Sequence, residues 1–202
     1  GEVRREDLDA YLSKRLGGLV AIERMLTERL QGRIGVAYRF DRVTQLDETK
    51  SYHLLAFPAE IKWSTVEDVL DPVSGTRTRF LVQPSVDVSD FGTHFLKTEA
   101  EASHFIPVGE SRDLIVALRM KLGAIVGADR DEIPPDERFY AGGGGSVRGY
   151  PYRTISPLVD DDPIGGRSVV ESAVELRKKI TETIGFVIFV DGGTVSESSF
   201  PD

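Results

Sequence analysis

The densest group of unusual residues is the stretch RFYAGGGGSVRGYPYR at positions 138–153, where four consecutive glycines precede one arginine, Arg148. Glycine-rich loops can cradle phosphate, and residues 144–149 fit the spacing G-x-x-x-x-G. A phosphate-binding loop then needs Lys followed by Ser or Thr, but Tyr150 and Pro151 stand there and no helical pattern follows. The dinucleotide spacing G-x-G-x-x-G fails too, because position 148 is arginine. We therefore expect no phosphate site.

Residues that usually perform catalysis or bind metals are sparse in this chain. There is no cysteine, and the three histidines, His53, His94 and His104, lie far apart without the spacing of metal ligands. The acidic run at 160–162 could bind Ca²⁺, but a solvated loop is the simpler interpretation. No Ser or Thr lies in a nucleophile motif. We expect no enzyme, no cofactor and no metal site.

The glycine-rich loop also carries large side chains, which a solvated linker does not usually contain. The residues that favour burial are Phe139, Tyr140, Val147, Tyr150 and Tyr152. We therefore expect the loop to fold back onto the protein, with an ordinary flexible linker as the alternative. An Arg148 side chain removed from water then needs acceptors, because an unpaired buried cation is costly.

Three residues near the end of the chain are candidate partners for Arg148. Alternate residues of a strand share a face, so Phe189 and Asp191 lie together on the polar face of the segment 184–191. Glu175 lies on the polar face of the preceding segment. Charge-assisted hydrogen bonds between the guanidinium and these carboxylates would hold the loop.

Apolar and polar residues alternate along most of the chain, which is the pattern of β-strands. In the segment GRIGVAYRFD, for example, Ile34 and Val36 share one face and the arginines share the other. The start of the chain is ambiguous, because Leu8, Leu12 and Leu16 also fit a helix with i, i+4 spacing. We predict about eight strands, at 19–26, 32–41, 55–64, 79–89, 93–106, 113–127, 170–180 and 184–191.

Composition limits the class of protein. With 202 residues, 40% hydrophobic and 29% charged, the chain suits one substantial domain or two small ones. Its net charge of −8 argues against a general nucleic-acid surface. Apolar runs are too short for a membrane-spanning helix, which needs about 18 to 20 residues, whereas a membrane-spanning strand needs only about 9–11 residues with alternate ones apolar.

The predicted connections alternate between short and long, as in outer-membrane barrels. Short links lie near 27–31, 71–75, 107–113 and 181–183, and long links lie at 42–54 and 128–167, although the fourth link, at 89–93, is short. A soluble β-sandwich would show the same periodicity with its apolar face in a dry core, and this alternative stays open. Charges such as Arg119 and Glu175 on the polar faces favour a wet lumen. Trp63, Tyr38 and Phe40, near predicted strand ends, fit aromatic girdles.

The loop sequence resembles the long sixth loop of the BamA/TamA superfamily of outer-membrane assembly barrels. The hallmark of that loop is V-R-G-F/Y, which here is Val147-Arg148-Gly149-Tyr150. The tyrosine, and the continuation through residues 151–157, are more similar to the TamA branch of the family than to BamA. The resemblance is specific at residues 138–196 and consists of strand pattern alone before them.

The resemblance implies roles for the loop residues. In the family the loop arginine reaches down the lumen to an F-x-D motif, here Phe189-x-Asp191, and to a glutamate best matched by Glu175. Removing one partner of such a buried pair would cost about 3–5 kcal/mol. A hinge of glycines would let the loop turn sharply and pass close to the barrel wall, where a Cβ would collide. These glycines are Gly142, Gly143, Gly144 and Gly145.

The resemblance also implies an all-β antiparallel transmembrane barrel in the bacterial outer membrane. Residues 1–202 would be a partial barrel domain of about eight strands from about sixteen, with a loop at about 128–167 folded into the lumen. Its function would be that of an insertase or translocase for autotransporters and other barrel proteins. Its partners would be a TamB-like periplasmic protein, these clients and the lipid bilayer, without nucleic acid. A BamA-type general assembly factor and a soluble β-sandwich binding protein are the alternatives.

Overall fold

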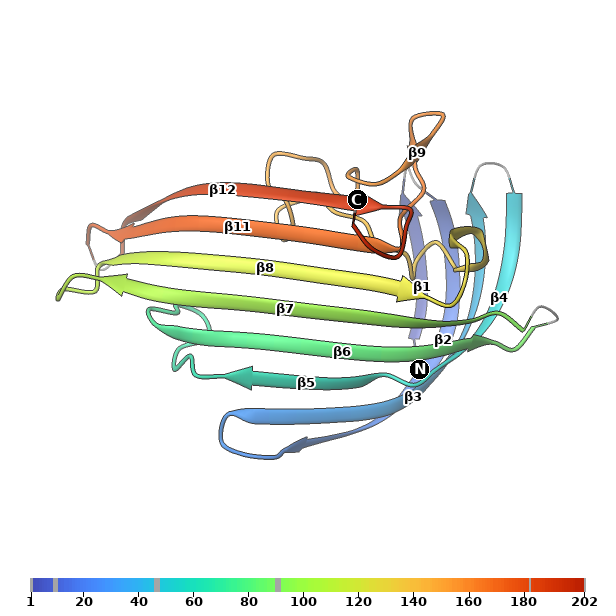
Figure 1. The fold of residues 1–202 in the computed structure, drawn as a ribbon, viewed down its shortest axis with the longest axis horizontal. Coiled ribbons are helices and arrows are strands. Elements are labelled where there is room, and N and C mark those ends of the chain that lie inside the picture. Colours follow the sequence, from blue (N-terminus) through green and yellow to red (C-terminus); the bar gives the residue numbers. More distant parts are fainter. Residues whose placement is uncertain (1, 9–10, 46–47, 90–91, 182, 202) are drawn as a thin grey trace.

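A computed structural model describes residues 2–8, 11–45, 48–89, 92–181 and 183–201. They form one curved antiparallel sheet of ten strands in the order β1-β2-β3-β4-β6-β7-β8-β11-β12, in which β5 pairs with β3 and β6 (Figure 1). Among these residues no helix is long and apolar enough to cross a membrane. The strands of the sheet are β1 (Glu2–Leu8), β2 (Tyr11–Met25), β3 (Leu30–Gln45), β4 (Glu48–Ala56), β5 (Ala59–Ser64), β6 (Gly75–Asp87), β7 (His94–Val108), β8 (Leu114–Val126), β11 (Ser168–Lys179) and β12 (Gly185–Ser196).

The predicted all-β antiparallel fold is confirmed, but the strands are more numerous and longer than predicted. The ambiguous start of the chain is strand, because β1 pairs with β2 and β2 pairs with β3 along nearly their whole lengths. The predicted strand at 55–64 is split by Phe57-Pro58 into β4 and β5, which together fill one position between β3 and β6. Proline lacks the backbone N–H that a continuous ladder requires.

The long connection predicted at 42–54 is wrong, because β3 and β4 extend through most of it. In this region the buried apolar residues, Val43, Tyr52 and Leu54, face the concave side of the sheet. In the predicted strands the continuous apolar row faces outward, and that row does not extend through residues 42–54, so the alternation gave no strand here. The extension of β3 to Gln45 also places Tyr38 in the middle of the strand and not at a girdle near its end.

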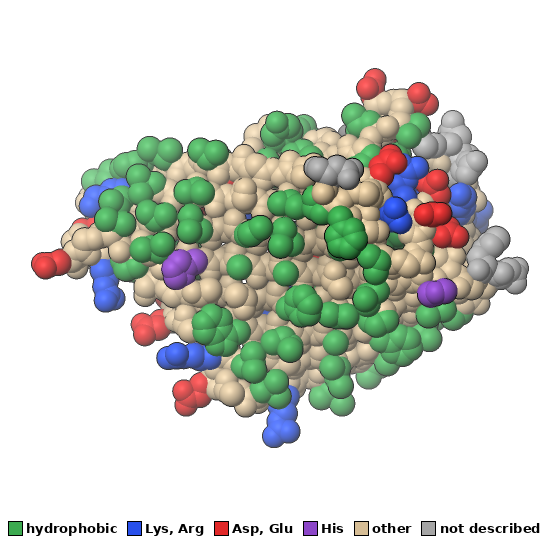
Figure 2. All heavy atoms as spheres, viewed as in Figure 1, with side chains coloured by type: hydrophobic (Ala, Val, Ile, Leu, Met, Phe, Trp, Pro, Cys, Tyr) green, Lys and Arg blue, Asp and Glu red, His purple; other side chains and the backbone are tan. Residues whose placement is uncertain are grey.

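The convex face of the sheet is apolar and exposed. Figure 2 shows hydrophobic side chains spread over the visible outer face, with charged side chains gathered toward the ends of the molecule. A soluble sandwich would cover its apolar face with a second sheet, so that alternative is wrong for this fold. A lipid-facing wall shows this polarity, with apolar residues outward and polar residues inward. Examples of the outward residues are Ile34, Val36, Phe80, Met120, Val174 and Ile188.

The segment 65–74, which joins β5 to β6, crosses the concave side at the end where the turns are short. Val66 and Val73 pack against a buried cluster on the inner face of β7 and β8. Asp71 forms an ion pair with Lys179 at the end of β11. This segment therefore reaches across three neighbouring strands, although the sequence predicts only a tight turn here.

The connection from β8 to β11, residues 127–167, is called the inner loop. It contains a 3₁₀ helix, η1 (Arg130–Glu132), and a hairpin of β9 (Leu158–Val159) and β10 (Asp162–Pro163). Tyr150 and Tyr152 are 58% and 60% exposed, so the burial expected for them is wrong. The other three residues expected to be buried, Phe139, Tyr140 and Val147, are buried. The resulting core combines strand residues Leu54, Phe95, Ile125, Val169 and Val195 with loop residues Ala128, Ile133, Phe139, Ala141 and Val147.

Candidate functional site in the inner loop

The side chain of Arg148 makes a two-point contact with Asp191 on β12. Arg148 Nε donates to Oδ2 and Nη2 donates to Oδ1 of Asp191, both at 2.6 Å. The backbone N–H of Arg148 also donates to Oδ2, at 3.0 Å. The Asp191 side chain is only 1% exposed. Parallel hydrogen bonds of this kind fix the orientation of the guanidinium as well as its position.

Two further residues complete the environment of Arg148. Nη1 lies 2.6 Å from Oε1 of Glu175 on β11, and Arg177 donates to the other oxygen of that carboxylate at 2.7 Å. The guanidinium carbon lies 3.5 Å from the centre of the Phe189 ring, which is cation–π geometry. The hydrogen bonds that Arg148 donates to Asp191, together with the Glu175 carboxylate, raise the pKa of Arg148 above its usual range. The structure thus places Arg148, Glu175, Phe189 and Asp191 together.

The residues beside Arg148 hold the tip of the inner loop against the sheet. Val147 is 2% exposed and faces Gly193 of β12, where a Cβ would lie 2.9 Å from Cγ2 of the valine. Arg119 on β8 donates to the backbone carbonyl oxygens of Gly145 and Ser146. The sequence placed Arg119 on the polar face but supplied no partner for it, because its acceptors are backbone atoms.

The four glycines of the predicted hinge differ in what they do. Gly142 and Gly143 have φ of +106° and +97°, a conformation that a side chain makes strained. A Cβ at Gly142 would also lie 2.5 Å from the carbonyl oxygen of Pro151. Gly144 and Gly145 have open space around them and do not adopt that φ. The sharp turn thus requires only the first two.

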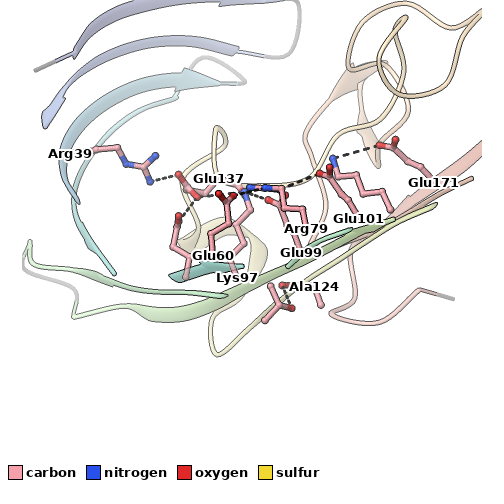
Figure 3. A network of polar contacts seen from close by, with 12 residues as sticks. Arg39, Glu60, Arg79, Lys97, Glu99, Glu101, Ala124, Glu137 and Glu171 are labelled. Carbon is pink, nitrogen blue, oxygen red and sulfur yellow. Dashed lines mark hydrogen bonds and ion pairs between the residues drawn. The ribbon is translucent and has the colours of Figure 1, made fainter. Parts of the chain in front are cut away.

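A second polar cluster, which the sequence reasoning missed, binds the base of the inner loop to the opposite part of the sheet. Glu137 is buried and forms an ion pair with Arg39 on β3 (Figure 3). Lys97 on β7 donates to the Glu137 carbonyl oxygen at 2.9 Å, and Gln83 on β6 donates to Oε2 at 3.1 Å. Burial alone would raise the pKa of Glu137, but the charges of Lys97 and Arg39 hold it below its usual value.

The inner face between these two clusters is lined with paired charges (Figure 3). Arg79 on β6 contacts Glu60 at 2.5 Å, Glu99 at 3.1 Å and Glu101 at 3.3 Å. These pairs keep the concave side polar, as the alternation of the sequence predicted. The sequence shows which residues face inward, but the pairing depends on strand register and curvature.

The histidines and the acidic run lie apart from these clusters. His53 lies within β4, and its Nδ1 is 2.8 Å from the Tyr38 hydroxyl. His104 contacts Thr76 at 2.8 Å. The run at 160–162 lies at the exposed hairpin of β9 and β10. Within the described ranges no group of three His, Cys, Asp or Glu could hold a metal ion. The arrangement around Arg148 holds the tip of the inner loop against β11 and β12.

Comparison with known proteins gives a consistent family and fold. The Omp85 superfamily domain matches residues 2–202. A SAM50-like protein of Schizosaccharomyces pombe is 22% identical over 131 residues, which are 60% of this chain and 28% of that protein. The crystal structure of BamA from Haemophilus ducreyi lacking POTRA domains 1–3 matches with a TM-score of 0.75 and 18% identity, over 96% of this chain and 44% of that chain. This chain thus spans less than half the length of either protein.

Proposed function

Because the chain belongs to the Omp85 superfamily, we propose that the full-length protein is an assembly barrel that helps client barrel proteins insert into the outer membrane. The family and the apolar convex face place the chain in an outer membrane. The partial-barrel fold is shared with BamA. In this proposal the protein acts as an insertase or translocase and not as an enzyme.

Within this family, we propose a TamA-type role, with autotransporters among the clients and a TamB-like periplasmic partner. The support for it is the loop sequence, in which tyrosine follows Val147-Arg148-Gly149 and a second tyrosine stands at 152. A BamA-type role as a general assembly factor is the competing assignment. The two roles differ in the range of clients that fail when the protein is lost.

The role proposed for Arg148 is to anchor the tip of the inner loop to β11 and β12. The observation that carries this role is the two-point contact with the almost fully buried Asp191. Removing one member would leave an uncompensated charge beside the sheet, which costs about 3–5 kcal/mol for a buried pair. An anchored tip would hold the inner loop at one position inside the space that the curved sheet encloses, where we propose that it supports the assembly of clients.

The test uses cells that depend on the full-length protein. Depletion is expected to reduce surface display of autotransporters while most other outer-membrane barrels still assemble, and Arg148→Ala is expected to reproduce that defect. Asp160→Asn, which removes an exposed carboxylate from the same loop, is the matched control and is expected to behave as the parent protein. Loss of all barrel proteins would favour the BamA-type role, and unaffected assembly would contradict both.

A further inference from the structure

We propose that the inner loop is a cross-brace with two separate clamps, and that Asp136 and Glu137 form the second clamp, which positions the base of the loop. The first clamp joins Arg148 to β11 and β12. The second joins the loop base to β2, β3, β6 and β7. The two clamps share no residue and bind different parts of the curved sheet.

The second clamp consists of two neighbouring carboxylates that are almost fully buried. The side chains of Asp136 and Glu137 are 2% and 5% exposed. Asp136 forms an ion pair with Arg15 on β2, and Arg15 Nε also lies 2.9 Å from Oδ1 of Asp41 on β3. Carboxylates buried to this extent require cationic partners, because isolated buried charges are strongly destabilising. Strand residues of the sheet supply those partners, so ion pairs fix the position of the loop base.

Glu137 receives contacts from three more strands. Arg39 on β3 pairs with one carboxylate oxygen, whereas Gln83 on β6 donates to the other. Lys97 on β7 lies 3.6 Å from the same carboxylate and donates to the Glu137 backbone carbonyl. A single loop residue therefore contacts strands on both sides of the β4–β5 position. Contacts from several directions fix its position more strictly than one surface ion pair could.

The contacts that fold the loop base onto itself are distinct from the wall contacts of Glu137. Arg138 is buried and donates to the carbonyl oxygens of Ile133 and Ile164, both at 2.9 Å and both in the inner loop. Its Nη1 also donates to Oε1 of Gln45 on β3 at 3.1 Å, so Arg138 adds a wall contact that does not depend on Glu137. The N–H of Glu137 closes a turn on the carbonyl oxygen of Pro134 at 2.9 Å. The loop base can therefore keep its local shape without the wall contacts of Glu137, which makes those contacts separable by mutation.

The position of the two clamps gives the loop its mechanical role. Along the sheet, β2 and β3 are separated from β11 and β12 by the β4–β5 position, β6, β7 and β8. Figure 1 shows the inner loop lying between these two regions on the concave side. Any change in the curvature of the sheet would change the distance between the clamps. A loop held at both ends therefore resists widening or narrowing of the space that the sheet encloses.

The experiment measures the two clamps separately in the full-length protein. Residues 1–202 contain no cysteine, so once any cysteine elsewhere in the full-length protein is replaced, pairs of introduced cysteines can carry spin labels at chosen positions. One pair of labels, at Asp131 and His94, gives the base distance and reports on the second clamp. The other pair, at Gly144 and Val187, gives the tip distance and reports on the first clamp. The labelled positions are exposed, and in each pair one position lies in the inner loop and the other lies in β7 or β12.

Glu137→Gln is expected to broaden the base distance and leave the tip distance narrow, whereas Arg148→Ala is expected to do the reverse. Cleavage of the loop base by proteinase K in Glu137→Gln is expected to rise about tenfold or more, because cleavage follows the population of the opened form. The exchanged pair Glu137→Arg with Arg39→Glu is expected to recover part of the narrow distribution. Asp160→Asn again serves as the control.

Unchanged base distances and cleavage in folded Glu137→Gln would overturn the proposal. If that variant does not fold, Gln83→Leu removes one neutral donor to Glu137, and it is expected to broaden the base distance less. An unchanged base distance in Gln83→Leu would count against the clamp. The two-clamp arrangement does not depend on the proposed function. Only a role of the brace in client insertion would rest on that function. Distances and cleavage are measured without clients, so failure of the proposed function would leave this result intact.

Discussion

The ring of Phe139 in the inner loop lies directly against the backbone of Gly123 on β8. A Cβ at position 123 would lie 2.5 Å from Cζ of the phenylalanine and 2.9 Å from Cγ1 of Val169 on β11. At this point a side chain of the inner loop contacts the backbone of the sheet. The sequence predicts such close approach at glycines 142–145 of the loop, whereas the glycine that admits Phe139 belongs to a strand.

Gly123→Ala is expected to displace Phe139 and loosen the inner loop, because overpacking in a close-packed site costs about 1–3 kcal/mol. Cleavage by proteinase K and heat-modifiable mobility of the full-length protein would measure the effect. Gly144→Ala is the control, since position 144 has open space and no restrictive φ. Equal behaviour of the two variants would show that the contact at Gly123 contributes nothing.

The contact between Arg148 and Asp191 is expected to be the stronger part of the first clamp. Arg148→Ala should destabilise the docked loop by about 3 kcal/mol, because it leaves the buried Asp191 carboxylate without its paired cation, whereas Glu175 keeps Arg177. Asp191→Asn should cost less, because Glu175 still pairs with the guanidinium. The exchange of both charges should recover part of the loss. Loop cleavage and heat-modifiable folding measure each variant, and an unchanged Arg148→Ala would refute the anchor.

Phe189→Leu tests the aromatic part of the same clamp. The substitution keeps an apolar side chain but removes the ring that lies 3.5 Å from the guanidinium carbon. A loss of about 0.5–2 kcal/mol is expected, because cation–π contacts have that range. Chemical denaturation followed by gel mobility would measure it. Tyr150→Phe, at an exposed position, is the comparison and should show no loss.

Acid is expected to release the second clamp. The pKa of Glu137 lies below its ordinary 4.5, since Lys97 and Arg39 outweigh the effect of burial, and Arg15, Asp41 and Asp136 are further charged groups nearby. A lowered folded pKa means that this stabilisation is complete above 4.5 and is lost as pH falls through the lower value. The base distance between Asp131 and His94 should therefore broaden in acid.

Glu137→Gln provides the control for that pH dependence. Its base distance should already be broad at neutral pH and should change little on acidification, because the amide does not titrate in this range. If the parent protein and the Glu137→Gln variant had the same pH profile, the transition would come from the titration of other groups. Spin-label distances at several pH values distinguish these outcomes.

Part of the site could be predicted because its residues carry strong local signals. Arg148 stands in a distinctive tetrapeptide, and Asp191 and Glu175 lie on faces that strand parity assigns directly. Asp136 and Glu137 lack such a signal, since acidic residues after two prolines suit any solvated turn. Their partners stand 40 residues or more away along the chain, as Lys97 does from Glu137. Periodicity within one strand contains no information about such contacts.

The sequence by itself determined the β-strand content, the polarity of the wall and the identity of the loop arginine. These features depend on the alternation of neighbouring residues and on a short motif, both of which are local. Only the tertiary structure decided where the loop base binds, which glycine receives Phe139, and that Val43 and Leu54 face inward. Those outcomes depend on how far the sheet curves and on what fills its concave side, because curvature brings distant strands to one loop and packing reverses the local preference for the outer face.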